Sequence, residues 1–219
     1  MLASRASHSV PPSGANKPQW RCWAKAVWPQ LPLDVLSQSV LELLVQQPFF
    51  LQARRVALYC PRADELNLCL LWHMPEAQQK TWLLPRVGQP TRGETPESLF
   101  FHPYHPQDPL LKNQYGILEP EPPGSEQKEE ESNWDLLLVP ARVVDAQGYR
   151  LGFGKGFYDR LLARSPQPRA FVTASLIPEA LLVEVLPRDP WDLPVDWILT
   201  ESQCRLTSPV GRANVKQNS

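Results

Sequence analysis

The segment Arg150-Leu-Gly-Phe-Gly-Lys-Gly-Phe-Tyr-Asp-Arg160 contains three glycines, three cationic side chains and one aspartate within eleven residues. It comes after the apolar run Leu136–Val139. Within and beyond it, Phe157, Leu161 and Leu162 have the spacing of one face of a helix. We therefore expect the glycines to form a turn between a strand and a helix.

A strand, a glycine-rich turn and a helix N-terminus together can bind an anion. Glycine lets the backbone approach phosphate oxygens closely, and the first N–H groups of a helix lack partners. The spacing is neither the G-x-G-x-x-G of a dinucleotide-binding turn nor a P-loop, because no Ser or Thr follows Lys155. Arg150 and Lys155 supply charge for a polyphosphate, and Asp159 is a candidate magnesium ligand. The alternative is a glycine-rich turn with a solvated charge cluster.

The composition limits the classes of partner and compartment. With 219 residues, 42% of them hydrophobic, the chain is long enough for a single domain with a sizeable core. A net charge of −1 gives no overall basic field, so nucleic acid is not an expected partner. No apolar run reaches the roughly 18 residues that cross a bilayer, so no membrane is expected either. The cysteines, at 22, 60, 69 and 204, form no C-x-x-C pair, which favours a reduced, cytoplasmic protein. We also expect a monomer.

The composition changes along the chain and predicts the domain boundaries. Residues 1–16 are rich in Ser, Pro and Ala and are expected to form a disordered N-terminal tail rather than a transit peptide. Residues 17–203 are expected to form one domain. Within it, residues 121–133 form an acidic loop that can bury nothing. Residues 204–219 are assigned to a C-terminal tail.

Helices and strands are predicted to alternate within that domain. Helices are expected from Lys17 to Trp28, from a cap at Asp34 to before Pro48, and over 68–72 and 157–163. Strands are expected at 56–60, 81–87, 98–101, 136–139, 170–175 and 197–200, with 115–120 as a loop. This order predicts a single-domain α/β sandwich with a mostly parallel or mixed central sheet flanked by helices. Its functional residues are expected in loops at the carboxyl ends of the strands.

Taken together, the motifs resemble those of the 5-formyltetrahydrofolate cyclo-ligase family, also called methenyltetrahydrofolate synthetases. The likeness extends from about Lys17 to Thr200, and its most specific part is Asp145-x-x-Gly148-x-Arg150-Leu-Gly-x-Gly-Lys-Gly-Phe-Tyr-Asp159. Supporting segments occur in the family's order: Lys17-x-x-x-Arg21, Asp64-Glu65, Leu84-Pro-Arg86, Gly116-Ile-Leu-Glu-Pro120 and Asp192-x-Pro-x-Asp196.

The resemblance implies a ligase that uses ATP and the cofactor Mg²⁺ to convert 5-formyltetrahydrofolate to 5,10-methenyltetrahydrofolate, releasing ADP and phosphate. In that reaction the formyl oxygen attacks the γ-phosphate, and N10 of the folate then closes the ring. The implied fold is an α/β sheet between helices, similar in architecture to sugar-phosphate isomerases and acyl-CoA transferases.

The resemblance also implies a set of site residues. For ATP these are Lys17, Arg21, Arg150, Leu151, Gly152, Phe153, Gly154, Lys155, Gly156, Phe157 and Tyr158. For the folate they are Cys60, Glu65, Phe153, Gly154, Lys155, Gly156 and Phe157, and Arg21 can also reach it. For magnesium they are Asp159 and Asp192. Lys155 and Arg150 are the expected catalytic residues, with Lys155 stabilising charge on the transferring phosphoryl group.

Three positions depart from the family's usual pattern. The family usually has Thr at Leu68, often Gly at Ala141, and often a basic residue near Val27. These departures leave open a non-catalytic relative that binds a nucleotide or a folate. A sugar-phosphate isomerase or an acyl-CoA transferase is a further alternative, which Lys155 and the two candidate magnesium ligands disfavour. Without the resemblance, Asp192 is typical of a turn, and Glu65 of a helix N-terminal charge.

Overall fold

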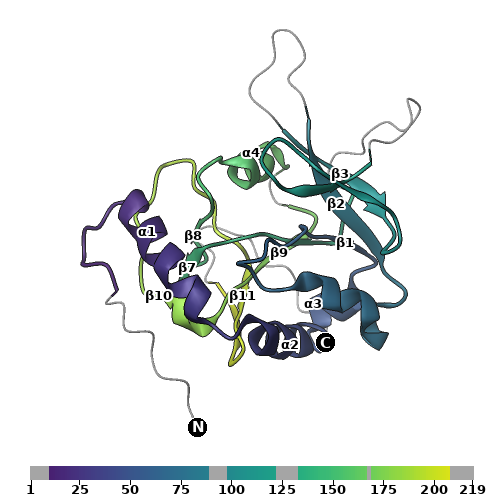
Figure 1. The fold of residues 1–219 in the computed structure, drawn as a ribbon, viewed down its shortest axis with the longest axis horizontal. Helices are drawn as coiled ribbons and strands as arrows, with labels where there is room; N and C mark the ends of the chain where they lie inside the picture. The colour runs from purple at the N-terminus through teal and green to yellow at the C-terminus, as the bar shows by residue number, and fades with distance from the viewer. Residues whose placement is uncertain (1–9, 89–97, 122–132, 167–168, 208–219) are drawn as a thin grey trace.

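The computed structural model describes residues 10–88, 98–121, 133–166 and 169–207. A seven-stranded sheet forms its centre (Figure 1). From edge to edge its strands are β12 (Cys204–Leu206), β11 (Trp197–Leu199), β9 (Val172–Leu176), β6 (Leu136–Leu138), β1 (Arg55–Ala57), β2 (Thr81–Val87) and β3 (Leu99–Tyr104). The inner strands are parallel, whereas β3 and β12 pair antiparallel at the two edges. This arrangement confirms the predicted α/β class and its mostly parallel sheet.

The inner strands are largely buried because both faces of the sheet are covered, and β6 is apolar along its whole length. All three residues of β6 are fully buried, and in β1 Val56 lies opposite Trp82 on one side and Leu136 on the other. Parallel strands covered on both faces show continuous apolar runs rather than alternation. This is why short runs such as 136–139 were recognisable as strands.

Eight helical segments are found among the described residues. They are α1 (Lys17–Val27), η1 (Trp28–Gln30), α2 (Leu33–Leu44), α3 (Pro48–Gln52), η2 (Leu68–His73), η3 (Pro75–Ala77), α4 (Phe157–Arg164) and η4 (Glu179–Leu181). Figure 1 shows α2 and α3 on one side of the central sheet and α4 on the other. Within the described ranges no helix is long and apolar enough to cross a membrane.

The start of α1 is fixed by its own sequence. The Asn16 side chain accepts a hydrogen bond from Gln19 N at 3.0 Å, and the Gln19 side chain accepts one from Asn16 N at 2.8 Å. This reciprocal capping box satisfies two helix-start donors, and Pro18 suits the first turn. The cap therefore sets where Lys17 and Arg21, four residues apart, project from the helix.

A second, smaller sheet leads into the glycine-rich segment. It has the order β10 (Leu182–Val183), β7 (Val143–Asp145) and β8 (Arg150–Leu151), with β7 and β8 antiparallel. Buried Asp145 holds the turn between them, because its Oδ1 accepts hydrogen bonds from Gln147 N at 2.9 Å and Tyr149 N at 3.0 Å. Gly148 completes the turn with a φ of 89°. The Asp-x-x-Gly part of the motif is therefore a structural turn.

Several predicted elements differ from the structure. The strand directly before the glycine loop is β8, not the run 136–139, which is a central strand. Helix α2 begins at Leu33, and Asp34 lies in its first turn without capping it, because Pro32 occupies the cap position. The helix predicted over 68–72 is the 3₁₀ helix η2.

Two segments expected to lack regular structure are strands. Leu118–Pro120 forms β5, which pairs antiparallel with β4 (Leu110–Lys112) as a separate hairpin. Cys204–Leu206, assigned to the C-terminal tail, is edge strand β12, because it folds back to pair with β11. The rest of that tail, residues 208–219, lies outside the described residues, as do residues 1–9 of the N-terminal tail and 122–132 of the acidic loop.

Candidate active site

A cavity of about 590 Å³ lies beside the ends of strands β1, β2 and β6. Its wall also includes the first turns of α1 and α4, the glycine loop, the β4–β5 hairpin and the turn at 189–192. The structure brings every site residue named from the sequence to this wall: Lys17, Arg21, Cys60, Glu65, Arg150, Leu151, Gly152, Phe153, Gly154, Lys155, Gly156, Phe157, Tyr158, Asp159 and Asp192. Their roles toward a ligand stay predictions.

At the N-terminus of α1, Lys17 holds two carboxylates. Its Nζ donates to Asp189 Oδ2 at 2.7 Å and to Asp192 Oδ2 at 2.5 Å. Burial by itself lowers the pKa of Lys17, but the hydrogen bonds to these two aspartates outweigh burial and hold the pKa above its ordinary value. The Lys17 ammonium is therefore charged and faces the cavity together with both carboxylates.

One turn further along α1, Arg21 braces the glycine loop. Its Nε donates to Gly152 O at 3.0 Å. A Cβ at Gly154 would lie 3.5 Å from the Arg21 guanidinium carbon. Arg21 therefore holds the loop directly, while its remaining N–H groups can meet an anion above it.

The glycine loop ends at the start of α4 in a backbone conformation that favours glycine. Gly154 and Gly156 have φ values of 90° and 67°, and Gly156 is the N-cap of α4. Gly156 offers no side chain, so no side-chain hydrogen bond caps this helix start. Lys155, between these glycines, is exposed, with its Nζ 5.4 Å from the ring centroid of Tyr115. Unpaired helix N–H groups beside an exposed lysine form a site for phosphate oxygens.

Arg150 lies beneath this loop rather than projecting into open solvent. Its guanidinium Nη1 donates to Leu193 O at 2.7 Å, and its Nη2 donates to Asp159 Oδ1 at 3.0 Å. Burial lowers the pKa of Arg150 from its ordinary value, while Asp159 opposes that shift. The side chain predicted to be catalytic is thus already paired with one of the predicted metal ligands.

The inner end of the cavity is polar but buried. Glu65 Oε2 accepts a hydrogen bond from Arg62 N at 2.8 Å, and burial raises the pKa of Glu65 to about 7. Near it, the buried hydroxyl of Tyr158 has no hydrogen-bond partner among the described residues. Burial also raises the pKa of the Cys60 thiol to about 12, so this thiol stays neutral. Buried groups without partners are uncommon, and at a cavity they indicate a polar ligand.

Sequence reasoning missed the arginine that supports this end. Arg142 donates from Nη1 to Asp64 O at 2.9 Å and forms an ion pair with Asp64 Oδ2 at 2.9 Å. Its guanidinium also lies 4.9 Å from the Trp28 ring centroid and 5.1 Å from that of Phe153. Nothing in the local sequence marks Arg142, because its partners come from three distant segments.

The hairpin and the turn at 189–192 add further residues that the motifs did not assign to the site. Tyr115 lines the cavity, and its ring centroid lies 6.0 Å from that of Phe157. Glu119, part of the Gly116–Pro120 motif, accepts hydrogen bonds from Val87 N at 2.8 Å and Asn113 Nδ2 at 2.6 Å. Glu119 therefore ties the hairpin to β2. Trp191 also lies in the cavity wall.

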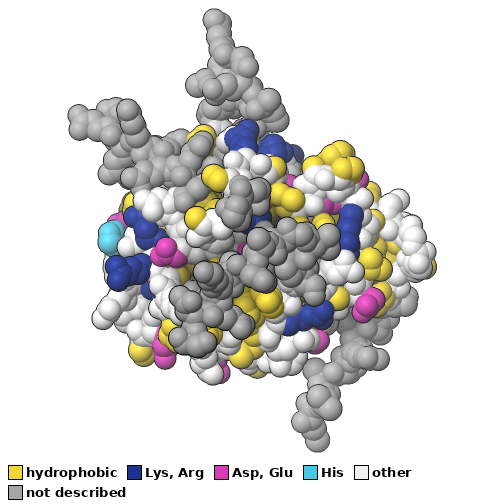
Figure 2. All heavy atoms as spheres, turned by 180° about the vertical axis from the view of Figure 1, so that it is seen from behind, with side chains coloured by type: hydrophobic (Ala, Val, Ile, Leu, Met, Phe, Trp, Pro, Cys, Tyr) yellow, Lys and Arg dark blue, Asp and Glu magenta, His cyan; other side chains and the backbone are white. Residues whose placement is uncertain are grey.

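The face of the molecule opposite to that in Figure 1 shows no large continuous basic surface in its described part (Figure 2). Figure 2 shows small groups of Lys and Arg side chains there, with uncharged and hydrophobic side chains between the groups. No group of three or more His, Cys, Asp or Glu that could hold a metal ion is found in the part of the chain that the structure describes. The cavity wall contains several Lys and Arg side chains together with five carboxylates, those of Glu65, Glu119, Asp159, Asp189 and Asp192.

Comparisons with known proteins agree on one family. Residues 30–201 match the model of the 5-formyltetrahydrofolate cyclo-ligase family. The chain is 33% identical over 164 residues to 5-formyltetrahydrofolate cyclo-ligase of Haemophilus influenzae, covering 75% of this chain and 82% of that protein. It is 29% identical over 183 residues to the Escherichia coli K12 protein of the same name, covering 82% and 94%.

A solved structure shares the fold. The chain is similar to the NMR structure of Aquifex aeolicus 5,10-methenyltetrahydrofolate synthetase, with a TM-score of 0.71 and 32% identity over 92% of this chain and 97% of the other. The family match includes the glycine loop and the turn at 189–192, whereas Lys17 and Arg21 precede it.

Proposed function

The chain belongs to the 5-formyltetrahydrofolate cyclo-ligase family, and from this premise we propose that it converts 5-formyltetrahydrofolate and ATP into 5,10-methenyltetrahydrofolate, ADP and phosphate. Conversion of 5-formyltetrahydrofolate to 5,10-methenyltetrahydrofolate requires the formyl oxygen to leave. The formyl carbon on N5 loses its oxygen and gains a bond to N10, which loses a proton. Transfer of the γ-phosphoryl group to the formyl oxygen turns that oxygen into part of a phosphate, a good leaving group. The proton from N10 ends on the released phosphate.

The observation that carries this proposal is that one cavity has two chemically different ends. One end has the glycine loop, the uncapped start of α4 and the cations Lys17, Arg21 and Lys155. The other end is enclosed and has the buried carboxyl of Glu65 and the hydroxyl of Tyr158, which has no hydrogen-bond partner among the described residues. A triphosphate suits the first end, and a flat heterocycle with N–H donors suits the second. The formyl oxygen and the γ-phosphate would then meet between them.

The protein's part in the reaction is positioning and charge neutralisation. In this proposal Lys155 meets the oxygens of the transferring phosphoryl group, because it is exposed at the tip of the loop. Arg21 and Lys17 hold the remaining phosphates. Arg150 contacts Asp159 and the backbone at Leu193, and so fixes the relative positions of the loop, helix α4 and the turn at 189–192.

The carboxylate oxygens of Asp159 and Asp192 are suitable ligands for a magnesium ion that binds together with the nucleotide. Mg²⁺ prefers oxygen ligands and binds through one or two carboxylates plus water and phosphate oxygens. Asp159 and Asp192 both line the cavity, and each is paired with a cation, Arg150 or Lys17. We propose that they hold Mg²⁺, which when bound neutralises phosphate charge. The two cations hold the carboxylates in place.

The folate end is proposed to bind the pterin. Glu65 can accept hydrogen bonds from pterin N–H groups when ionised, and Tyr158 can donate or accept one. The rings of Phe157 and Tyr115 form an apolar edge beside them. The cytoplasmic location and monomeric state expected from the sequence stay predictions.

The test is an assay on purified protein with 5-formyltetrahydrofolate, ATP and Mg²⁺, following the near-ultraviolet absorbance of the methenyl product. We expect product only when all three are present, with one ADP formed per product. If ATP binds but no methenyl product forms, the chain is a non-catalytic relative. If product forms without ATP, the proposed phosphoryl transfer is wrong.

A further inference from the structure

One aromatic side chain of the cavity has no role in the scheme above. Trp191 is 64% exposed, yet it lies in the cavity wall. No ring among the described residues contacts its indole. Trp is among the side chains with the most to gain from burial, so an indole left in water at a cavity mouth favours a flat ligand that would cover it.

The turn that carries this indole is braced before any ligand binds. Asp189 N donates to Asp192 Oδ2 at 2.7 Å, and Asp192 N donates to Asp189 O at 3.0 Å. Lys17 bonds both carboxylates, and Arg150 Nη1 donates to Leu193 O at 2.7 Å. These contacts fix the backbone on both sides of the indole. A preorganised platform binds a ligand at a smaller ordering cost than a mobile one.

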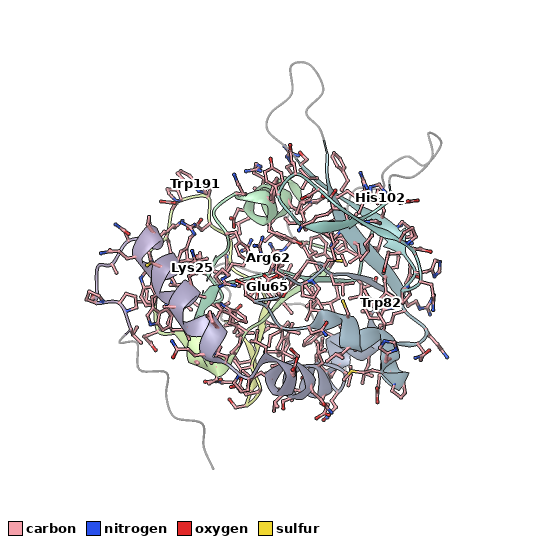
Figure 3. All side chains as sticks on the ribbon, viewed as in Figure 1. Lys25, Arg62, Glu65, Trp82, His102 and Trp191 are labelled. Atoms are coloured by element: carbon pink, nitrogen blue, oxygen red, sulfur yellow. The ribbon has the colours of Figure 1, made fainter. Side chains whose placement is uncertain are left out.

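The contacts of the turn that carries the indole favour the nucleotide over the folate as its ligand. Figure 3 shows Trp191 at the rim of the molecule, whereas Arg62 and Glu65 lie near its middle. The pterin is assigned to the Glu65 end, so of the two rings of the folate only the p-aminobenzoyl ring extends away from that end. Lys17, a phosphate cation in the proposed function, bonds the aspartates on either side of Trp191. The ring joined to those phosphates, through the ribose, is the base of the nucleotide, and we take it as the ligand nearest to the indole.

We propose that Trp191 stacks on the base of the bound nucleotide, an inference that rests on the ATP dependence proposed above. Stacking uses the face of the base and not its hydrogen-bonding edge, so it adds affinity for any purine nucleotide. Phosphate binding by the loop and base binding by Trp191 are then separate contributions to nucleotide affinity.

Calorimetric titration with two probes separates these contributions. The probes are ATP and inorganic tripolyphosphate, each with Mg²⁺, because tripolyphosphate has the charges but no base. We expect Trp191→Ala to weaken ATP binding by about tenfold, in line with base–aromatic stacking. Tripolyphosphate binding should change by less than about twofold, and Trp191→Phe should keep most of the ATP affinity. Val185→Ala, at a residue that is 56% exposed outside the cavity wall, is the matched control.

The outcomes distinguish this inference from the proposed function. Unchanged ATP binding in Trp191→Ala, or an equal loss for both probes, overturns the stacking role. A loss of affinity for 5-formyltetrahydrofolate alone would assign the indole to the folate instead and also overturns it. If the wild-type protein forms no methenyl product but the base-dependent loss is seen, the stacking role holds and the proposed function fails. If the wild-type protein binds neither probe, both fail.

Discussion

The guanidinium of Arg150 is buried against Asp159, with Nη2 and Oδ1 3.0 Å apart, and its other terminal nitrogen donates to Leu193 O at 2.7 Å. One side chain thus connects strand β8, helix α4 and the turn that precedes β11. The Arg150 side chain is 4% exposed and the Asp159 side chain 30% exposed. The charge of Arg150 is therefore stabilised less by water, and more by its partner, than the charge of Asp159.

Removing the carboxylate should therefore destabilise the fold. Asp159→Ala removes the ion-pair partner of the buried Arg150 charge and leaves Leu193 O as the hydrogen-bond partner of its guanidinium in the described part of the chain, so we expect the free energy of unfolding to fall by about 2–4 kcal/mol. Urea denaturation measures this loss. Glu184→Ala, which removes an exposed carboxylate, should change stability by less than about 0.5 kcal/mol. Equal stabilities of the two variants would show that Arg150 does not need Asp159.

Lys155 should matter for turnover and not for folding. Its side chain is exposed and forms no ion pair in the described part of the chain. If it stabilises charge on the transferring phosphoryl group, Lys155→Ala should lower kcat by roughly 100-fold or more and leave Tm nearly unchanged. Lys25→Ala, at an exposed lysine in the last turn of α1, is the control and should change neither quantity. Parallel losses of kcat and Tm in Lys155→Ala would contradict the assigned role.

Glu65 should make stability depend on pH. Burial raises its pKa from 4.5 to about 7 in the folded protein, so the folded state binds this proton more tightly than the unfolded state. The resulting stabilisation is fully present below the unfolded pKa of 4.5 and is lost as pH rises through about 7. The total loss is on the order of 3 kcal/mol.

The variant Glu65→Gln tests this dependence because it keeps the shape and cannot ionise. Relative to wild type, its Tm should be higher at about pH 8 than at about pH 5. Glu76→Gln, at an exposed position, should show no such trend. A Tm difference between Glu65→Gln and wild type that stays constant across this pH range would contradict a raised pKa of Glu65 in the folded protein.

Two glycines of the loop should respond differently to the same substitution. Gly154 has a φ of 90°, whereas Gly152 lies outside the left-handed region and an added Cβ there meets no atom within 4 Å. Gly154→Ala should cost about 1–2 kcal/mol because of backbone strain, and Gly152→Ala should leave stability near wild type. Thermal unfolding of both variants checks this contrast. Equal Tm values would place Gly154 in an ordinary conformation in solution.

The central sheet and the glycine loop were predictable from the sequence for different reasons. Inner parallel strands such as 136–139 are apolar on both faces, so even a three-residue strand is visible as a continuous run. The loop combines glycines, cations and an aspartate at a spacing that few other functions require. Strands β8 and β10 have two residues each, too few for any periodicity, and their sheet was not predicted.

Contacts between distant segments were also outside the reach of sequence reasoning. Arg142 acts through Asp64, Trp28 and Phe153, and no local pattern connects these four positions. Strand β12 depends on a turn that returns the chain to β11, which composition does not reveal. The pairing of Arg150 with Asp159 was likewise missed, although both residues had been assigned to the site. Sequence spacing identifies which residues belong to one site, but not which of them form ion pairs or hydrogen bonds with each other.

The most direct test of the proposed reaction follows the formyl oxygen. 5-Formyltetrahydrofolate labelled with oxygen-18 in the formyl group is converted with ATP and Mg²⁺, and the released phosphate is examined by mass spectrometry. If the formyl oxygen attacks the γ-phosphate in this cavity, each phosphate carries one labelled oxygen. Label appearing in water, with unlabelled phosphate, would contradict the phosphoryl transfer on which this interpretation of Lys155, Arg150 and the glycine loop depends.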